Sequence, residues 1–251
     1  MAKRIRADQL LFQQGLAESR EKAKRLIMAG QALLVTKGTP VLVDKPGQQL
    51  REDDLLELKE AERFVSRGGY KLLTAIEHFN LDFEGLTCLD AGASTGGFTD
   101  CLLQHGAQKV YAVDVGTAQL HEKLRNDPRV ISMENTNLRT APADLLPETV
   151  DAVVMDVSFI SLTRILPACM HYLSPAGFLV VLIKPQFELG PEKNHKGVVR
   201  NEADRLQAVT LVREFAQQEL GLTVTDVVPS SIKGPKGNQE YLALLQNSPK
   251  R

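Results

Sequence analysis

The chain contains few cysteines: Cys88, Cys101 and Cys169 are the only three among 251 residues, and none stands in a Cys-x-x-Cys pair. An odd number without that spacing predicts reduced thiols in the cytoplasm rather than a disulfide framework. The five histidines are scattered and lack the spacing of metal ligands. We therefore expect no zinc or other metal site.

Long apolar segments are missing as well. The run FLVVLI at 178–183 is far shorter than the roughly 20 residues of a membrane helix, and the N-terminus has no signal-peptide core. We expect no association with a membrane. The hydrophobic content of 43% is typical of ordinary globular cores, and the length suits one medium domain with a smaller one.

A large net charge is also absent, since the formal charge is -1 at pH 7. This value argues against a uniformly basic nucleic-acid binder, but the average conceals a basic segment near the start. The cations of the first 38 residues are Lys3, Arg4, Arg6, Arg20, Lys22, Lys24, Arg25 and Lys37, against only Asp8, Glu18 and Glu21.

The patterning divides the chain into a small α+β domain (1–59), a charged linker (60–67) and a larger α/β domain (68–251). The small domain is predicted to contain one helix from Ile5 to Gln14 and a second that Ser19 caps and that ends at Gly30. A hairpin should follow, with strands at 32–35 and 40–43 around a turn at Lys37-Gly38, and a further strand at 55–58.

Strand and helix patterns alternate in the larger domain. Helices are predicted around 72–79 and 206–215, and strands near Cys88, Val110, Ile131, Val153, Val181, Val224 and Leu242. Such alternation specifies a mainly parallel, Rossmann-like sheet with helices on both faces.

The run LDAGASTGGFTD at 89–100 indicates a buried strand that ends in a glycine-rich turn and opens a helix. Gly92, Gly96 and Gly97 are expected to remove Cβ atoms where a ligand approaches, although an ordinary packing turn is the alternative. The dinucleotide fingerprint does not fit, because Ser94 stands where its second glycine would admit a pyrophosphate.

A second strand ends at Asp114, about 20 residues after the turn, where a carboxylate can hold ribose hydroxyls. S-adenosylmethionine has a ribose and no phosphate, so it fits both features. The candidate cofactor-binding residues are Asp90, Gly92, Ser94, Thr95, Gly96, Gly97, Phe98, Asp114 and Asn135, with Asn137 and Arg139 as further candidates near the adenine.

Four other segments bring a charged residue to the end of a predicted element. They are SRGGYKL with Lys71, VVMDVSFISL with Asp156, VVLIKPQFE with Lys184 and GPKGNQEYL with Glu240. Each charge alone would suggest a surface salt bridge. All four together are expected to converge at one edge of the sheet.

Two resemblances extend this interpretation. The segment from Arg6 to Val35, above all SREKAKRLIMAG, resembles the S-four-like RNA-binding fold named after a small-subunit ribosomal protein, although Ala7 stands where that family usually has leucine. The resemblance implies that Arg4, Arg6, Arg20, Lys22, Lys24 and Arg25 meet RNA phosphates. A solvated helix face is the alternative.

The motifs RGGYKL, DAGASTGGFTD, DVSFISL, KPQFE and GNQEYL, in this order, resemble the TlyA or hemolysin A family, whose catalytic domain is similar to FtsJ-type ribose methyltransferases. The resemblance implies S-adenosylmethionine-dependent 2′-O-methylation of ribosomal RNA, with cytidine as the expected target. It also implies a catalytic tetrad of Lys71, Asp156, Lys184 and Glu240.

Lys184 is the candidate base, because burial at an apolar strand end beside cationic Lys71 favours a neutral amine. Asp156 and Glu240 are expected to orient the two lysines. Arg67, Lys233 and Lys236 are candidates to hold the RNA backbone, although a mobile surface loop is the alternative.

Other functions remain open. A ribosome-assembly factor could bind RNA without catalysis, but the intact set of Lys71, Asp156, Lys184 and Glu240 counts against it. The hemolysin name suggests a cytolysin, but the lack of a secretion signal and of a long apolar span counts against that function.

Methylation at a base carbon usually needs a cysteine nucleophile, but Cys169 falls on a predicted helix and Cys88 in the predicted cofactor strand. Methylation of an exocyclic amine commonly uses an Asn/Asp-Pro-Pro-aromatic loop, where this chain has DVSF at 156–159. Both reactions are therefore disfavoured. The ribosomal subunit modified and the oligomeric state also stay open.

Overall fold

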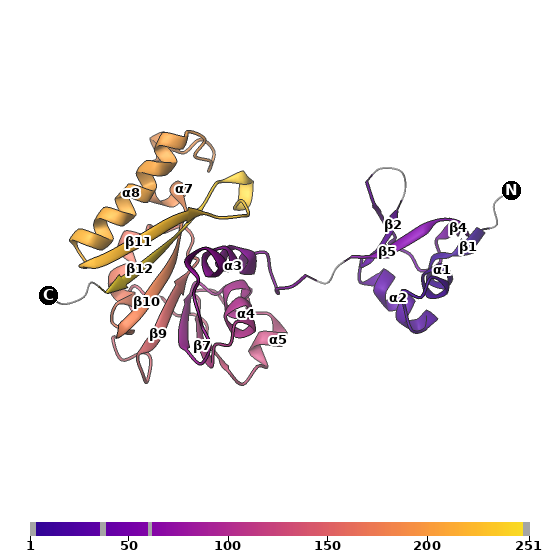
Figure 1. Ribbon diagram of the computed structural model, residues 1–251, viewed down its shortest axis with the longest axis horizontal. Helices are drawn as coiled ribbons and strands as arrows, with labels where there is room; N and C mark the ends of the chain where they lie inside the picture. Colours follow the sequence, from indigo (N-terminus) through magenta and orange to yellow (C-terminus); the bar gives the residue numbers. More distant parts are fainter. Residues whose placement is uncertain (1–3, 36–38, 60–61, 248–251) are drawn as a thin grey trace. The chain divides into compact units, whose positions relative to one another are not determined.

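The computed structural model describes residues 4–35, 39–59 and 62–247 (Figure 1). The chain forms two compact units, Met1–Arg63 and Phe64–Arg251. Each unit has a hydrophobic core of its own.

The smaller unit combines two helices with short strands. Its elements are β1 (Arg4–Arg6), α1 (Ala7–Gln13), α2 (Arg20–Met28), β2 (Ala32–Val35), β3 (Val41–Leu42), β4 (Gln49–Arg51) and β5 (Leu55–Leu58). The strands pair in the order β3-β2-β5, with β1 and β4 as a separate pair. The predicted strands and the cap of α2 are confirmed, since the Ser19 side chain accepts a hydrogen bond from the backbone of Lys22.

The predicted start of the first helix is wrong. Ile5 lies in β1, where it pairs with Leu50. Arg4 and Arg6 are exposed and Ile5 is buried, and this alternation with a period of two is that of a strand. The strand β4 had not been predicted. The predicted turn at Lys37-Gly38 lies outside the described residues.

The larger unit is built on a seven-stranded sheet with the order β11-β12-β10-β9-β6-β7-β8. Its strands are β6 (Thr87–Ala91), β7 (Lys109–Val113), β8 (Val130–Met133), β9 (Val150–Met155), β10 (Leu173–Ile183), β11 (Leu222–Pro229) and β12 (Tyr241–Asn247). The run from β10 to β8 is parallel, whereas β12 is antiparallel to both β10 and β11. The predicted fold class is confirmed.

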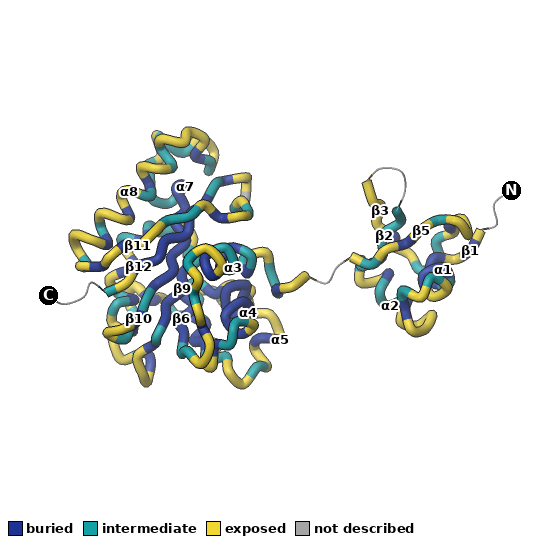
Figure 2. Tube along the Cα trace, in the orientation of Figure 1, coloured by how far each residue is buried: buried dark blue, intermediate teal, exposed yellow. Residues whose placement is uncertain are grey.

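Helices cover both faces of this sheet. They are α3 (Gly68–Phe79), α4 (Gly97–Gln104), α5 (Glu122–Arg125), α6 (Leu166–Cys169), α7 (Pro185–Glu188) and α8 (Glu202–Gln218), with short 3-10 turns at Leu162–Arg164, Pro191–Lys193 and Pro235–Gly237. Alternate residues of β9 enter two cores: Val153 and Met155 pack with α6 and α8, and Ala152 and Val154 pack with α3 and α4. Figure 2 shows these strands as the buried centre of the unit.

The larger unit includes part of the segment predicted as a linker. Phe64 is only 2% exposed, and its ring packs edge-on against that of Tyr70 at 5.1 Å between centroids. The unit therefore begins at Phe64 rather than at residue 68, because one aromatic side chain among charged neighbours finds a place in the core.

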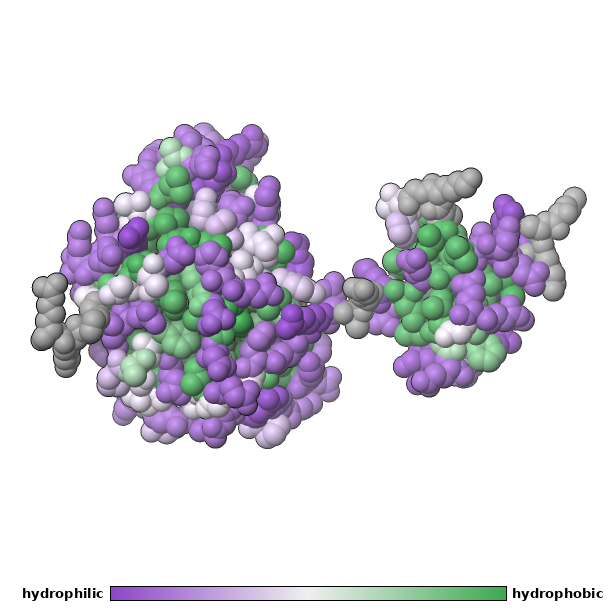
Figure 3. Space-filling model, in the orientation of Figure 1, coloured by the Kyte–Doolittle hydropathy of each residue, from purple (hydrophilic) through white to green (hydrophobic). Residues whose placement is uncertain are grey.

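Hydrophilic residues cover much of the face of each unit that Figure 3 draws. Among the described residues, no helix has both the length and the apolar character needed to cross a membrane.

Candidate active site

The carboxyl ends of the parallel strands form one edge of the sheet, and charged residues lie along it. Asp156 follows β9, and Lys184 follows β10. Glu240 immediately precedes β12, whose antiparallel direction sets Tyr241 opposite Ile183 at the end of β10. This edge borders the crevice in which such folds bind ligands.

Lys71 reaches the same edge from α3, because the start of this helix crosses the start of α4 at short range. A Cβ added to Gly97 would lie 2.9 Å from the backbone nitrogen of Gly69 and 3.0 Å from Cα of Gly68. A Cβ on Gly69 would collide with the ring of Phe64. Any side chain at these glycines would push the helices apart and displace Lys71.

The four charged residues form one connected charged cluster, Lys71, Asp156, Lys184 and Glu240. Nζ of Lys184 lies 2.5 Å from Oδ1 of Asp156, and Nζ of Lys71 lies 3.7 Å from Oδ2. Nζ of Lys71 is also 2.7 Å from Oε2 of Glu240. Both lysines and Glu240 are buried, which requires that their charges be compensated.

The loop before β12 leaves room for the Glu240 carboxylate because Gly234, which lies beside it, has no side chain. A Cβ on Gly234 would collide with the Glu240 carboxylate. The same loop is held by Asn238, whose side chain donates to the carbonyl of Gly197 and accepts from the backbone of Val199. The loops at 194–200 and 232–238 are thus joined at the edge of the site.

Two adjoining cavities open at this edge. The larger has a volume of about 790 Å³ and is lined by the whole charged cluster. The smaller, of about 520 Å³, is lined by Asp114, Asn137 and Arg139 together with apolar side chains that include Val115, Leu138, Ile160 and Ile165. The residues that line both cavities are Gly92, Ser94, Asp156, Ser158 and Phe159.

The glycines of the turn between β6 and α4 are required by protein neighbours. A Cβ on Gly92 would lie 3.0 Å from the carbonyl oxygen of Asp156, and one on Gly96 would collide with Leu124. Both glycines also have positive φ, +84° and +93°. Both glycines thus have a packing reason of their own, while the expectation that they also clear space for a ligand stays a prediction; Gly92 lines both cavities.

Asp114 holds the turn and the loop that follows β7. Its Oδ2 accepts a 2.8 Å hydrogen bond from the backbone of Ser94, and its Oδ1 accepts one of 2.7 Å from that of Gly116. Each carboxylate oxygen has a second lone pair, so Asp114 can still accept hydrogen bonds from ribose hydroxyls.

Most predicted cofactor contacts line a cavity: Gly92, Ser94, Thr95, Gly97, Phe98 and Asp114. Asp90, Gly96 and Asn135 line neither. Asp90 is fully buried and accepts a 2.6 Å hydrogen bond from the Thr99 hydroxyl, and burial raises the pKa of Asp90 to about 7. Oδ1 of Asn135 accepts from the hydroxyl of Thr117. Asp90 and Asn135 are thus held by hydrogen bonds within the protein, and the role of Asp90, Gly96 and Asn135 toward a cofactor stays a prediction.

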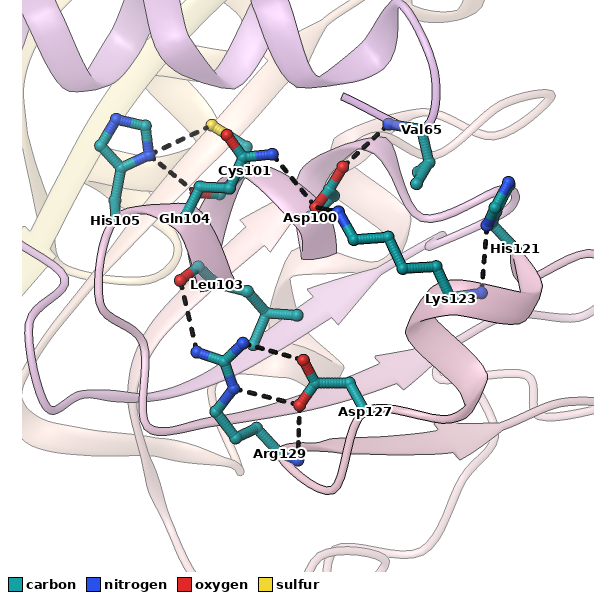
Figure 4. A network of polar contacts seen from close by, with 10 residues as sticks. All are labelled: Val65, Asp100, Cys101, Leu103, Gln104, His105, His121, Lys123, Asp127 and Arg129. Carbon is teal, nitrogen blue, oxygen red and sulfur yellow. Dashed lines mark hydrogen bonds and ion pairs between the residues drawn. The ribbon is translucent and has the colours of Figure 1, made fainter. Parts of the chain in front are cut away.

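Asp100 anchors α4 to its surroundings (Figure 4). Its Oδ2 accepts a hydrogen bond from the backbone of Val65, and its Oδ1 accepts from the side chains of Lys123 and Gln104. Val65 precedes α3 and Lys123 lies in α5, so one buried carboxylate links three segments. The α3–α4 crossing that positions Lys71 is stabilised by these bonds.

The RNA-binding candidates fall in both units. Arg67, Lys233 and Lys236 are exposed and line the larger cavity. In the smaller unit, several of the predicted cations already have acidic partners. Arg6 and Arg20 contact the buried Asp8 at 2.9 and 3.5 Å, and Lys24 contacts Glu21 at 2.6 Å. Arg4, Lys22 and Arg25 are exposed.

The sequence interpretation missed two residues of the segment DVSFISL. Phe159 is 91% exposed, has φ of +64°, and lies with its ring 5.2 Å from that of Phe187. The Ser158 hydroxyl accepts a 2.8 Å hydrogen bond from Lys184. An aromatic residue four positions after a strand end was a usable signal for Phe159, whereas nothing in the sequence distinguished Ser158.

Cysteine and metal chemistry receive no support from the described residues. Cys88, Cys101 and Cys169 are buried, and burial raises the pKa of Cys88 and of Cys169 to about 12. Thiols with such values are poor nucleophiles near neutral pH. Within residues 4–35, 39–59 and 62–247, no group of three His, Cys, Asp or Glu side chains could hold a metal ion.

The chain is similar to one family model, to characterised proteins and to solved structures. The family model described as FtsJ-like methyltransferase matches residues 64–247. The "16S/23S rRNA (cytidine-2'-O)-methyltransferase TlyA" of Mycobacterium tuberculosis is 43% identical over 254 residues, which cover 100% of this chain and 93% of that protein.

"Hemolysin A" of Brachyspira hyodysenteriae is 40% identical over 95% of this chain and 98% of its own length. A solved structure from Streptococcus thermophilus has 46% identity and a TM-score of 0.73, covering 99% of this chain and 90% of that one.

Proposed function

Because this chain belongs to the FtsJ-like methyltransferases and, within them, to the TlyA or hemolysin A family, we propose that it methylates ribosomal RNA. The methyl group comes from S-adenosylmethionine and goes to the ribose 2′-hydroxyl of a cytidine. The observation that carries this proposal is the charged cluster, in which Lys71 and Lys184 approach opposite oxygens of Asp156 at the sheet edge.

The residues of the smaller cavity fit the adenosine part of S-adenosylmethionine. Val115, Leu138 and Ile160 offer apolar surface to an adenine ring, and Asp114 offers acceptors to the ribose. Ser94 and Gly92 lie where the two cavities meet, which suits the part of the cofactor that leads to the methyl group. When bound, the cofactor supplies an electrophilic methyl group on a cationic sulfur.

Lys184 serves as the base that takes the proton of the 2′-hydroxyl. Lys71 stays cationic, because it is held between Glu240 and Asp156. With Lys184 neutral, the cluster has one cation and two anions, so uptake of a proton by Lys184 restores its neutrality. Positioning of the hydroxyl should supply much of the rate, and proton transfer about 10² to 10⁴-fold more.

The target nucleotide enters the larger cavity. Arg67, Lys233 and Lys236 supply positive charge for its phosphates. Phe159 presents its ring at the junction of the two cavities and can stack on a base that has left its helix. The smaller unit adds affinity for RNA through its basic residues, a contribution that weakens as salt rises.

The test is transfer of tritium from labelled S-adenosylmethionine to ribosomal subunits that lack the modification, followed by alkaline hydrolysis of the RNA. A 2′-O-methyl group blocks cleavage of the neighbouring phosphodiester, so the label should appear in alkali-resistant dinucleotides. Label in mononucleotides would indicate base methylation and contradict the proposal.

Two further readouts address the alternative functions. RNA binding without any transfer of label would favour a non-catalytic assembly factor. Release of dye from liposomes by the purified chain would favour a cytolysin. Mapping of ribose methylation in cells with and without the protein then identifies the nucleotide and the subunit.

A further inference from the structure

Ser158 lies beside the charged cluster but is not one of its four members. It follows β9 by three residues, is exposed, and lines both cavities. Its Oγ accepts a hydrogen bond of 2.8 Å from Nζ of Lys184, while Oδ1 of Asp156 accepts one at 2.5 Å from the same nitrogen. Lys184 thus has two fixed acceptors.

These two acceptors determine which proton Lys184 can lose. A lysine ammonium has three N–H bonds in tetrahedral directions. Two of these N–H bonds point to Asp156 and Ser158, and the hydrogen bonds that they donate hold both protons on the nitrogen. The third proton is the one that leaves, so the lone pair of the neutral amine occupies the remaining tetrahedral direction. Lys184 itself lines the larger cavity.

We propose that Ser158 is a positioning residue that, together with Asp156, aims the lone pair of Lys184 at the ribose hydroxyl. This inference rests on the proposed function. In the step itself, the O–H bond of the ribose breaks and an N–H bond to Lys184 forms, so the amine becomes an ammonium. The Ser158 hydroxyl keeps its own proton throughout.

Two other arrangements of the same contact predict different behaviour. Ser158 could relay the proton, receiving it from the ribose and passing its own to Lys184. Its hydroxyl could instead donate to the lone pair of neutral Lys184 and compete with the substrate. Mutation separates the three arrangements, because removal of the hydroxyl slows, abolishes or speeds the reaction respectively.

The experiment compares the full chain with Ser158→Ala and Ser158→Thr, which keeps a hydroxyl. Ser158→Ala should lower kcat about 10-fold with KM for RNA and for S-adenosylmethionine within about twofold, and Ser158→Thr should recover most of the loss. Ser132→Ala, on the exposed face of β8 and away from both cavities, is the matched control.

The pH dependence gives a readout that a purely structural role would not change. The Ser158 hydroxyl stabilises the ammonium of Lys184, so its removal should move the acid limb of the kcat profile to lower pH. The other charged groups that face Lys184 are Asp156 directly and, across it, Lys71 with Glu240. They are unchanged in the variant.

A titration of Lys184 in protein labelled with ¹³C at lysine Cε tests the same contact without turnover. The signal is identified by its absence in Lys184→Arg, and its midpoint should lie at lower pH in Ser158→Ala than in the wild type. An unchanged midpoint overturns the inference, as do an unchanged kcat, a kcat as low as that of Lys184→Ala, or a faster enzyme. Absence of wild-type turnover would overturn the proposed function instead, and the titration would still decide the role of Ser158.

Discussion

Lys184 and Asp156 form the shortest ion pair of the charged cluster, with 2.5 Å between Nζ and Oδ1. The two residues end neighbouring parallel strands, β10 and β9, whose register pairs Val181 with Met155. The two strands thus bring both residues to the same sheet edge, and the contact leaves Oδ2 of Asp156 for the second lysine, Lys71.

Replacement of Lys184 by alanine should abolish methyl transfer, with a fall of about 10² to 10⁴-fold or more, because the base is lost. Affinity for S-adenosylmethionine should stay nearly intact, since the smaller cavity does not include Lys184. Tritium transfer and calorimetric titration of the cofactor measure the two effects. Lys193→Ala, which removes a lysine paired with Asp204 instead, is the control. Full turnover by the Lys184 variant would refute its assigned role.

Removal of Glu240 should destabilise the larger unit. In Glu240→Ala the buried Lys71 keeps only Asp156 at 3.7 Å, and breaking a buried pair costs about 3 kcal/mol of the free energy of unfolding. The double variant Lys71→Met with Glu240→Leu should recover part of this loss. Urea unfolding measures the free energy of unfolding of the wild type, of Glu240→Ala and of the double variant. Glu21→Ala, which removes one partner of an exposed ion pair, should leave stability unchanged. Equal stability of Glu240→Ala and the wild type would contradict the burial argument.

The stability of the chain should carry a pH-dependent contribution from Asp90. Burial raises the pKa of its carboxyl to about 7, against about 3.9 in an unfolded chain. Between these values the folded state binds more protons, so the free energy of unfolding falls as pH rises, by up to about 1.4 kcal/mol per unit.

The variant Asp90→Asn lacks this contribution, and it should lose less stability than the wild type between pH 5 and pH 7. Urea unfolding at both values measures the difference. Glu188, whose pKa burial also raises, is present in both proteins and cancels. Identical slopes in the two proteins would show that Asp90 does not titrate in this range.

Replacement of Phe159 by alanine should weaken binding of the RNA substrate without affecting the fold. The side chain is 91% exposed, so Tm should not change, while loss of base stacking should raise KM for RNA about 10-fold. Phe159→Trp should retain activity because it preserves an aromatic face. An alanine variant with wild-type KM would mean that the ring does not touch the substrate.

Lys22→Gln and Arg25→Gln should each weaken RNA binding. Each should also reduce the slope of the logarithm of the binding constant against the logarithm of the salt concentration by about one. Both residues are exposed on α2. Filter binding over a range of salt concentrations provides the measurement. Lys109→Gln is the control, because Lys109 begins β7 at the opposite sheet edge and pairs with Glu148. Slopes unchanged by both substitutions would argue for a solvated helix face.

Much of the larger unit could be predicted because its signals are local. Apolar runs such as those around Val153 and Val181 fix the strands, and the alternation with helices fixes a parallel sheet. The smaller unit was less predictable at Ile5, where one turn of helix and three residues of strand have similar patterns. Only the pairing with Leu50 distinguishes them.

The amino-acid sequence by itself determined the kinds of residue at the sheet edge and their order, since each of Lys71, Asp156, Lys184 and Glu240 lies in or next to a recognisable local element. The tertiary structure alone decided the distances between them, the packing reason for Gly92 and Gly96, and the contact of Ser158 with Lys184. These depend on how closely helices and strands from distant parts of the chain approach one another, and no local pattern encodes such an approach.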